Sequence, residues 1–521
     1  MLRTNMTGAE CLMTTLVANR IGVCFMNPGT SEMHFVAGLD RVPELRGVLC
    51  LYEGVCSGAA DGYARMHGKP AATLLHLGPG LGNALSNFHN ARKARSPVVC
   101  IVGEHSTGHL KYDAPLTSDI AAFARTVSNQ IRTVESSQGL GASVSDTIAS
   151  ALAPPGQIAM LIVPADFSWL RAGPPGAVVA CTQRSMPSQE CIRDAARVLR
   201  SVRGRAGLIL GGSSPCARGL EAAGRLASET GVQVFIDRIA PRFSLGRGHY
   251  PAPKVPYFPE DARAAFADLS HLILVEAEAP VSFFGYPDTP SSPVPETCAI
   301  STLATREQDG TGGLEALAEE CGARKLFHIP DQAAATSADG PLTLDAVGQA
   351  LAALMPESAI VSDEMVSSGA VILPHLARAA AHDQLPITGG SIGQGLPVAV
   401  GAAIACPGRK VVALEADGSA MYSVQALWTL ARENLDVVIV ILANRRYRIL
   451  DIEMRRTGAP SIGQHANDML DLGRPDLDFV SMAHGMGVPA TRATTAEEFS
   501  KQFGMAIKEQ GPSLIEAVLC N

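Results

Sequence analysis

The sequence predicts an α/β fold of three doubly wound parallel-sheet domains, and two observations support it. Short apolar runs rich in branched residues alternate with helical patterns along the chain of 521 residues. Two stretches without periodicity, at residues 171–190 and 328–341, interrupt this alternation and are expected to be interdomain linkers. We therefore expect domains at residues 1–172, 188–327 and 342–521.

The composition is typical of a loop-rich α/β enzyme, with 47% hydrophobic residues, 50 Gly and 34 Pro. A formal net charge of −8 gives no reason to expect a nucleic-acid partner. No apolar run approaches the roughly 18 residues that span a membrane, and the N-terminus lacks the pattern of a signal peptide. The twelve cysteines form no CxxC pair, so we expect small core residues in a reducing cytoplasm.

The first third alternates strands with helices, and three strands are followed by polar residues. Strands are expected at residues 23–26, 48–52, 71–75 and 97–102, with the last at 157–164. Thr30, Glu53 and His76 lie at or just beyond the carboxyl ends of the first three strands, so they can share one cleft. Helix caps or solvated side chains are the alternative.

Two glycine-rich segments lie between these strands. Residues 54–66 form a helix of small residues, which implies that another element packs closely against it. Residues 78–83 are expected to form a glycine loop, and their spacing does not fit the GxGxxG pattern of dinucleotide sites.

The middle third predicts a smaller open α/β domain with strands at residues 206–210, 233–236 and 272–275. Gly211 to Ser214 ends the first of these strands and is expected to be a simple turn, with a ligand contact as the alternative. Phe283 and Phe284 follow the last strand. They either form an apolar wall of a substrate pocket or belong to the core.

The stretch from Lys410 to Leu450 carries the clearest chemical signal. One expected strand ends at Asp417, helical spacing follows, and a second strand ends at Asn444. A βαβ unit places both residues at neighbouring carboxyl ends, where their oxygens suit a hard cation carrying a diphosphate. Gly418 allows close backbone approach, and Ser419 can cap the helix. An ordinary turn would explain Asp-Gly-Ser alone, but the complete unit favours the cation site.

This unit resembles the metal–diphosphate motif of thiamine-diphosphate enzymes, which opens with Gly-Asp-Gly and closes with Asn-Asn. Here the positions are Ala416-Asp417-Gly418 and Ala443-Asn444. The resemblance implies bound thiamine diphosphate and Mg²⁺. It implies metal ligands from Asp417, Asn444 and the backbone carbonyl of Arg446, and cofactor contacts from Gly418, Ser419, Tyr447, Ser367, Gly390 and Ile392.

Two of these cofactor contacts lie in the segment Gly389 to Gly395. The resemblance places the carbonyl of Gly390 on the pyrimidine amine and the side chain of Ile392 beneath the cofactor. For Ser367 a helix cap is the alternative. Residues 445–464 are expected to form a mobile helix or lid.

The first third resembles the pyrimidine-binding domain of the same family through NPGTSEMHF, LYEGVCSGAADGYAR and LLHLGPGLGN. Benzoylformate decarboxylase and the catalytic (large) subunit of acetolactate synthase are similar in pattern. The resemblance implies that Glu53 activates the aminopyrimidine, that His76 is an active-site histidine and that Thr30 contacts the substrate carboxylate. The role of Glu53 requires a carboxyl group shielded from water at hydrogen-bonding distance.

The resemblance extends over essentially the whole chain, with pyrimidine, middle and diphosphate domains. In relatives the middle domain sometimes binds FAD or ADP, and FAD is left open here. Because Glu53 and Asp417 belong to different domains, which come from two subunits in relatives, a homodimer or homotetramer is implied.

The implied reaction is decarboxylation of a 2-oxo acid followed by ligation to a second carbonyl compound, as in acetolactate synthase. The loop after residue 275 of this chain corresponds to one that carries an active-site histidine in benzoylformate decarboxylase. Here Gly285 stands nearest to that position. The alternatives are a simple decarboxylase, which His76 favours, and a cofactor-binding paralogue without activity, which Glu53, Asp417 and Asn444 oppose.

Overall fold

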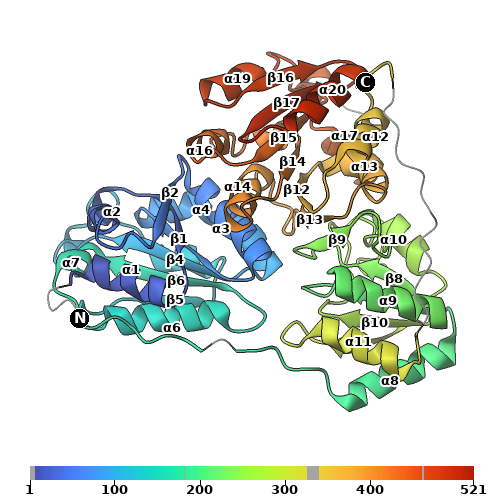
Figure 1. The fold of residues 1–521 in the computed structure, drawn as a ribbon, viewed down its shortest axis with the longest axis horizontal. Coiled ribbons are helices and arrows are strands. Elements are labelled where there is room, and N and C mark those ends of the chain that lie inside the picture. Colours follow the sequence, from blue (N-terminus) through green and yellow to red (C-terminus); the bar gives the residue numbers. More distant parts are fainter. Residues whose placement is uncertain (1–5, 181, 325–338, 460–462, 521) are drawn as a thin grey trace.

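Three sheets, parallel except for one edge strand of the third and each covered by helices, make up the computed structural model (Figure 1). It describes residues 6–180, 182–324, 339–459 and 463–520. The predicted fold class is confirmed, while the domain boundaries 1–172, 188–327 and 342–521 stay a prediction. The second expected linker lies mostly outside the described residues. Among the described residues we find no helix that could span a lipid bilayer.

The first sheet is fully parallel and has the strand order β2-β1-β3-β4-β6-β5. Its central strands are continuous apolar runs, as expected for a sheet covered on both faces. The elements are β1 (Val23–Asn27), β2 (Arg46–Leu49), β3 (Ala71–Leu75), β4 (Val98–Glu104), β5 (Gln130–Thr133), β6 (Ile158–Pro164), α1 (Gly8–Ala18), α2 (Met33–Gly38), α3 (Glu53–His67), α4 (Leu77–Ala94), α5 (Ile120–Arg125), α6 (Leu140–Leu152) and α7 (Ala165–Trp169).

Two local expectations for this unit are wrong. The expected glycine loop at residues 78–83 forms the first turns of α4, where Gly78 packs so closely on Ser118 that a Cβ would lie 1.8 Å from its Oγ. Pro79 is tolerated because it falls in the first turn of the helix. The second strand ends at Leu49, so Glu53 opens α3 and does not end a strand.

The second sheet is parallel, with the order β11-β10-β7-β8. Its edge strand β11 was not expected, because four of its six residues are at least partly exposed and the run is not continuously apolar. The elements are β7 (Ala206–Leu210), β8 (Gln233–Ile236), β10 (His271–Val275), β11 (Ala299–Ala304), α8 (Gln189–Val202), α9 (Ala217–Thr230), α10 (Pro259–Phe266) and α11 (Gly310–Glu320).

The third sheet has the order β16-β17-β15-β14-β12-β13-β9. Its edge strand β9 (Phe243–Leu245) comes from the middle of the chain and pairs antiparallel with β13. The other elements are β12 (Ala359–Glu364), β13 (His382–Pro386), β14 (Val411–Ala416), β15 (Val437–Ala443), β16 (Ala490–Ala493), β17 (Ser513–Val518), α12 (Leu344–Leu354), α13 (Gly369–Leu376), α14 (Gly395–Ala405), α15 (Asp417–Ala420), α16 (Ala426–Arg432), α17 (Arg448–Arg456), α18 (Gln464–Asp468), α19 (Phe479–Gly485) and α20 (Ala496–Ala506).

The predicted βαβ unit is confirmed, with one change. Strands β14 and β15 pair in parallel from Val411 opposite Val437 to Ala416 opposite Leu442. The single helix expected between them is broken into α15 and α16. The expected lid at residues 445–464 contains α17, and residues 460–462 lie outside the described ranges.

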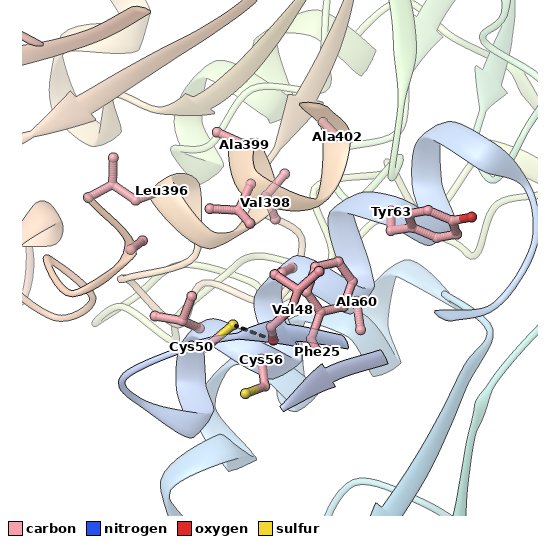
Figure 2. Close-up of a cluster of buried hydrophobic side chains, with 14 of the residues drawn as sticks. Phe25, Val48, Cys50, Cys56, Ala60, Tyr63, Leu396, Val398, Ala399 and Ala402 are labelled. Carbon is pink, nitrogen blue, oxygen red and sulfur yellow. Dashed lines mark hydrogen bonds between the residues drawn. The ribbon is translucent and has the colours of Figure 1, made fainter. Parts of the chain in front are cut away.

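Helices α3 and α14 cross at the junction of the first and third sheets (Figure 1). A Cβ at Gly62 would lie 2.2 Å from the carbonyl oxygen of Val398, and one at Gly401 would lie 1.9 Å from that of Ala59. This contact confirms the close packing predicted for the small-residue helix. The two units thus share one hydrophobic core, in which side chains of α14 face those of α3 (Figure 2).

Candidate active site

The carboxylate of Asp417 joins the ends of β14 and β15. Its Oδ1 accepts the backbone N–H of Gly418 at 2.9 Å, and its Oδ2 accepts the backbone N–H of Arg445 at 2.6 Å. Burial raises the pKa of Asp417, and these backbone donors oppose that shift. The two strand ends therefore meet at one buried carboxylate.

The segment after β15, residues 444–447, lies next to the Asp417 carboxylate. Asn444 Oδ1 accepts the backbone N–H of Arg446 at 2.9 Å. A Cβ at Gly418 would lie 2.4 Å from the ring of Tyr447, so glycine is needed there. Burial raises the pKa of Tyr447, and the nearby Tyr422 and Asp417 add to the shift. The structure thus brings together four of the predicted residues: Asp417, Gly418, Asn444 and Tyr447.

The remaining predicted diphosphate contacts lie on adjacent elements. Ser419 is buried in α15, one residue beyond Gly418. Ser367 is half-buried in a 3₁₀ helix, Val366–Ser368, that follows β12, and β12 is the sheet neighbour of β14.

These groups fit a cation that carries a diphosphate. In the part of the chain that the structure describes, no three His, Cys, Asp or Glu side chains are grouped to hold a metal. A cation at Asp417 would need oxygens from Asn444, a backbone carbonyl, water and phosphate. That ligand set is typical of Mg²⁺, which keeps waters and shares substrate phosphates.

The glycine segment before α14 is held against helix α4. His89 Nε2 lies 3.1 Å from the carbonyl oxygen of Gly389, and Asn90 Nδ2 donates to that of Ser391 at 2.7 Å. Asn87 Nδ2 donates to the carbonyl oxygens of Gly54 at 2.8 Å and Gly393 at 3.2 Å. The segment is therefore fixed next to the first turn of α3, which begins at Glu53. Sequence reasoning missed this anchor, although Asn87 and Asn90 stand at helical spacing.

Gly390 lies in this segment with φ +78°, a conformation that favours glycine. A Cβ at this residue would lie 2.3 Å from the ring of Phe283. Ile392 is half-buried nearby in the same segment.

Phe283 and Phe284 are exposed to 40% and 51%, so neither is a core residue. Their rings contact each other at 5.1 Å between centroids, and Phe283 contacts Tyr257 at 5.3 Å. The wall of a substrate pocket remains their predicted role, with Phe283 the side chain that lies next to Gly390.

Glu53 is buried at the first residue of α3. Its Oε2 accepts Asn83 Nδ2 at 3.0 Å, a contact that the sequence did not suggest. A Cβ at Gly80 would lie 3.3 Å from Glu53 Oε1 and 3.5 Å from His76 Cβ. Glu53 and His76 therefore flank the same glycine, with Glu53 at the first residue of α3 and His76 directly after β3.

His76 forms a dyad with a carboxylate that sequence reasoning missed. His76 Nδ1 lies 2.7 Å from Glu32 Oε2, which also accepts the backbone N–H of Gly29 at 2.8 Å. Burial raises the pKa of Glu32, while the Gly29 N–H and His76 oppose the shift. With Nδ1 engaged, proton exchange with a ligand would fall to Nε2. Thr30 is exposed on the same 3₁₀ helix, Thr30–Glu32.

Two buried carboxyl groups near the ends of β12 and β14 lie next to the glycine segment that precedes α14. Glu364 accepts the backbone N–H groups of Gly393 at 2.7 Å and Gly395 at 2.5 Å. Glu415 stands opposite Glu364 in the sheet register, and its own oxygens have no hydrogen-bond partner in the described structure. Burial raises the pKa of Glu364 to about 7. Burial and the neighbouring Glu364 and Asp363 raise that of Glu415 well above its usual range. The pair therefore retains a proton at neutral pH.

Replacing Glu415 with glutamine should make the folded protein less sensitive to alkaline pH. Both carboxyl pKa values are higher in the folded state, so stability is greatest at acid pH and falls as pH rises through about 7. Each such carboxyl contributes up to about 1.4 kcal/mol per pH unit to this slope. Urea unfolding of cofactor-free protein at several pH values should show a flatter profile for Glu415→Gln and a gain at pH 8. The exposed control Glu357→Gln should give a stability profile parallel to that of the wild type. A parallel profile for Glu415→Gln would contradict the prediction.

Comparisons with known proteins agree with this geometry. Residues 6–130 match the model of the thiamine pyrophosphate enzyme N-terminal TPP-binding domain. Residues 374–517 match that of the C-terminal TPP-binding domain. The first match contains Glu53 and His76, and the second contains Gly390, Asp417 and Asn444.

Individual relatives extend the similarity to the whole chain. A Mycobacterium tuberculosis protein is 47% identical over 516 residues, with 99% of both chains covered, and its name, acetolactate synthase large subunit IlvX, is itself provisional. Benzoylformate decarboxylase of Pseudomonas aeruginosa is 28% identical over 94% of this chain and 95% of its own. The structure of thiamine diphosphate-dependent 4-hydroxybenzoylformate decarboxylase from Rhodococcus jostii superimposes with a TM-score of 0.86 at 26% identity, covering 99% of each chain.

Proposed function

The chain belongs to the thiamine pyrophosphate enzyme family, and from this premise we propose that it decarboxylates a 2-oxo acid and joins the remaining fragment to a second carbonyl compound. It is a thiamine-diphosphate-dependent enzyme of the acetolactate synthase and benzoylformate decarboxylase type. The observation that carries the proposal is the meeting of β14 and β15 at Asp417, together with the shielded carboxyl group of Glu53.

Chain residues would hold the cofactor at both ends. Asp417, Asn444 and the carbonyl of Arg446 would ligate Mg²⁺, while Gly418, Ser419, Tyr447 and Ser367 would surround the diphosphate. Gly390 and Ile392 would position the pyrimidine ring. When bound, thiamine diphosphate supplies a nucleophilic carbon and an electron sink for the loss of CO₂.

Glu53 would hold a proton at the pyrimidine nitrogen. Its burial strengthens such a hydrogen bond, and the Asn83 amide fixes the orientation of the carboxyl group. Glu53 and Asp417 lie in different units, which come from two subunits in relatives, so we infer a homodimer or homotetramer with each site shared between subunits. The free cysteines of the described residues suit a cytoplasmic location.

Ligation is favoured over simple protonation by the loop after β10. Residues 280–286 contain no histidine, so the loop supplies no proton donor of that kind. It instead places the ring of Phe283 against Gly390. A carbonyl acceptor, shielded from water by this apolar wall, would then compete well with a proton.

The Glu32–His76 dyad favours a second candidate, non-oxidative decarboxylation. A histidine held through Nδ1 by a buried carboxylate is a suitable proton donor through Nε2.

Product analysis separates these functions. The protein, saturated with thiamine diphosphate and Mg²⁺, is given pyruvate or benzoylformate, and the products are identified by chromatography. An acyloin product supports ligation, whereas an aldehyde alone supports the decarboxylase. Absence of turnover with a broad set of 2-oxo acids would favour a cofactor-binding paralogue without activity.

A Glu32→Gln variant should lower kcat by at least about tenfold and move the alkaline limb of the kcat/KM profile to lower pH, because the proton-donating form of His76 loses the carboxylate that stabilises it. Steady-state rates between pH 5 and 9 test this, with the exposed Glu44→Gln as the matched control. An unchanged pH profile would remove the dyad from the reaction, whatever its effect on stability.

A further inference from the structure

The middle unit has a crevice at the carboxyl ends of its strands, on the side facing the first unit. The crevice opens into a cleft of about 690 Å³, lined by both units. The turn Gly211 to Ser214 follows β7 on one side, and α11 begins at Gly310 on the other. In an open parallel sheet, a small-residue turn facing a helix start forms a cradle for phosphate groups.

A side chain of the protein already fills this cradle. Glu276 follows β10 and is fully buried. Its Oε2 accepts the backbone N–H of Ser213 at 2.8 Å, and its Oε1 accepts the backbone N–H of Gly310 at 2.9 Å. The hydroxyl of Ser213 adds a further hydrogen bond at 3.0 Å. The donors that a phosphate would use are therefore paired with a carboxylate.

Arg184 completes the enclosure and connects it to the first unit. Its Nη1 donates to Glu276 Oε2 at 2.8 Å, and its Nη2 donates to the carbonyl oxygen of Pro155 at 3.2 Å. The guanidinium offsets the charge of the buried carboxylate and spans the cleft. A second anion at this point would have to displace Glu276 or lie against it.

The backbone conformation of Glu276 and the glycines around it accommodate its side chain in the cradle. Glu276 has φ +51°, a conformation that ordinary residues rarely adopt and that glycine adopts readily. A Cβ at Gly212 would lie 2.3 Å from Glu276 Oε2, and one at Gly310 would lie 2.6 Å from Glu276 Oε1. Both glycines thus leave room for the carboxylate.

We propose that Glu276 is a built-in occupant of the phosphate cradle and that its carboxylate prevents nucleotides with a diphosphate group, including FAD and ADP, from binding to the middle unit. Flavin and adenine nucleotides bind at this unit in some relatives, and here the residues do not fit such a ligand. The inference does not depend on which 2-oxo acid the enzyme uses.

Equilibrium dialysis with ADP tests the proposal. The enzyme is saturated with thiamine diphosphate and Mg²⁺, so the catalytic diphosphate site is filled. Wild-type protein should bind no ADP with a Kd below about 1 mM, and it should carry no flavin absorbance after purification. Glu276→Gly removes the carboxylate at a φ that glycine favours, and it should bind ADP at least tenfold more tightly than wild type. Glu276→Ala, whose folding is checked by retained turnover, should do the same.

The matched control is Glu278→Ala, which removes an exposed carboxylate two residues away and should leave ADP binding at the wild-type level. Bound flavin in the wild type, or micromolar ADP binding by it, would overturn the proposal. Equal, weak ADP binding by wild type and both folded Glu276 variants would show that another feature closes the crevice, and would also overturn it.

Discussion

Replacing Glu53 with glutamine should lower kcat by about 10²- to 10⁴-fold while thiamine diphosphate and Mg²⁺ still bind. The amide has the shape of the carboxyl group and can still contact Asn83. It cannot exchange a proton with the pyrimidine nitrogen, however, so the loss should fall on turnover. The proposed diphosphate and metal ligands lie in the third unit and are unchanged in this variant. Steady-state kinetics with saturating cofactor give kcat, and calorimetric titration gives the cofactor Kd.

Two controls make this result interpretable. Glu135→Gln makes the same chemical change on an exposed carboxylate just after β5 and should leave kcat unchanged. Asn83→Ala removes the orienting amide and should cause a smaller loss than Glu53→Gln. Normal turnover by Glu53→Gln would exclude Glu53 from proton transfer. A large loss of cofactor affinity would show that it acts in binding instead.

The fold was predictable where a strand is a continuous apolar run, whereas the buried but polar strand β13 was missed. Strands β4, β6 and β15 are continuous apolar runs, and their lengths separate them from helices. The edge strands β5 and β11 escaped prediction because much of each faces solvent and carries polar residues. Strand β9 escaped because it pairs with a strand far along the chain, which no local pattern records.

The glycine segment after β3 shows why propensity alone misleads. Gly78, Gly80 and Gly82 favour a loop by their low helix propensity. Contacts with distant residues decide otherwise, since Gly78 packs on Ser118, and Gly80 lies between Glu53 and His76. The same small size that weakens the helix locally is what allows it to pass so close to the candidate site.

The candidate site was predictable in its strand-end residues and not in their partners. Parallel topology places His76 and Asp417 directly after the ends of β3 and β14, and Glu53 lies a few residues beyond β2 at the start of α3. Glu32, Asn83 and Asn87 act through contacts that span 30 to 306 positions of sequence, and these depend on helix packing. Glu364 and Glu415 appear in the sequence as ordinary strand ends. Only the sheet register shows that two carboxyl groups share one buried position.

Replacing Asp417 with alanine should weaken binding of thiamine diphosphate in the presence of Mg²⁺ by at least about 100-fold. The change removes the carboxylate proposed to bind the cation and leaves the backbone N–H groups of Gly418 and Arg445 without this acceptor. Loss of hydrogen bonds to a charged group costs about 1.5–3 kcal/mol each, and this cost falls on the stability of the cofactor-free protein. The weaker binding instead follows from the lost negative charge beside the proposed cation. Calorimetric titration of the cofactor at fixed Mg²⁺ measures the change.

An Asp417→Asn variant separates the metal role from the structural one. The amide oxygen can still accept one backbone N–H, so the strand ends should stay together and cofactor-free stability should change less than in Asp417→Ala. Without the negative charge, Mg²⁺ should no longer strengthen cofactor binding. Asp339→Ala, at an exposed aspartate just before the third unit, should behave as wild type. If Mg²⁺ still promotes binding to Asp417→Asn as strongly as to wild type, the cation must bind elsewhere, and the meeting of β14 and β15 would serve the fold alone.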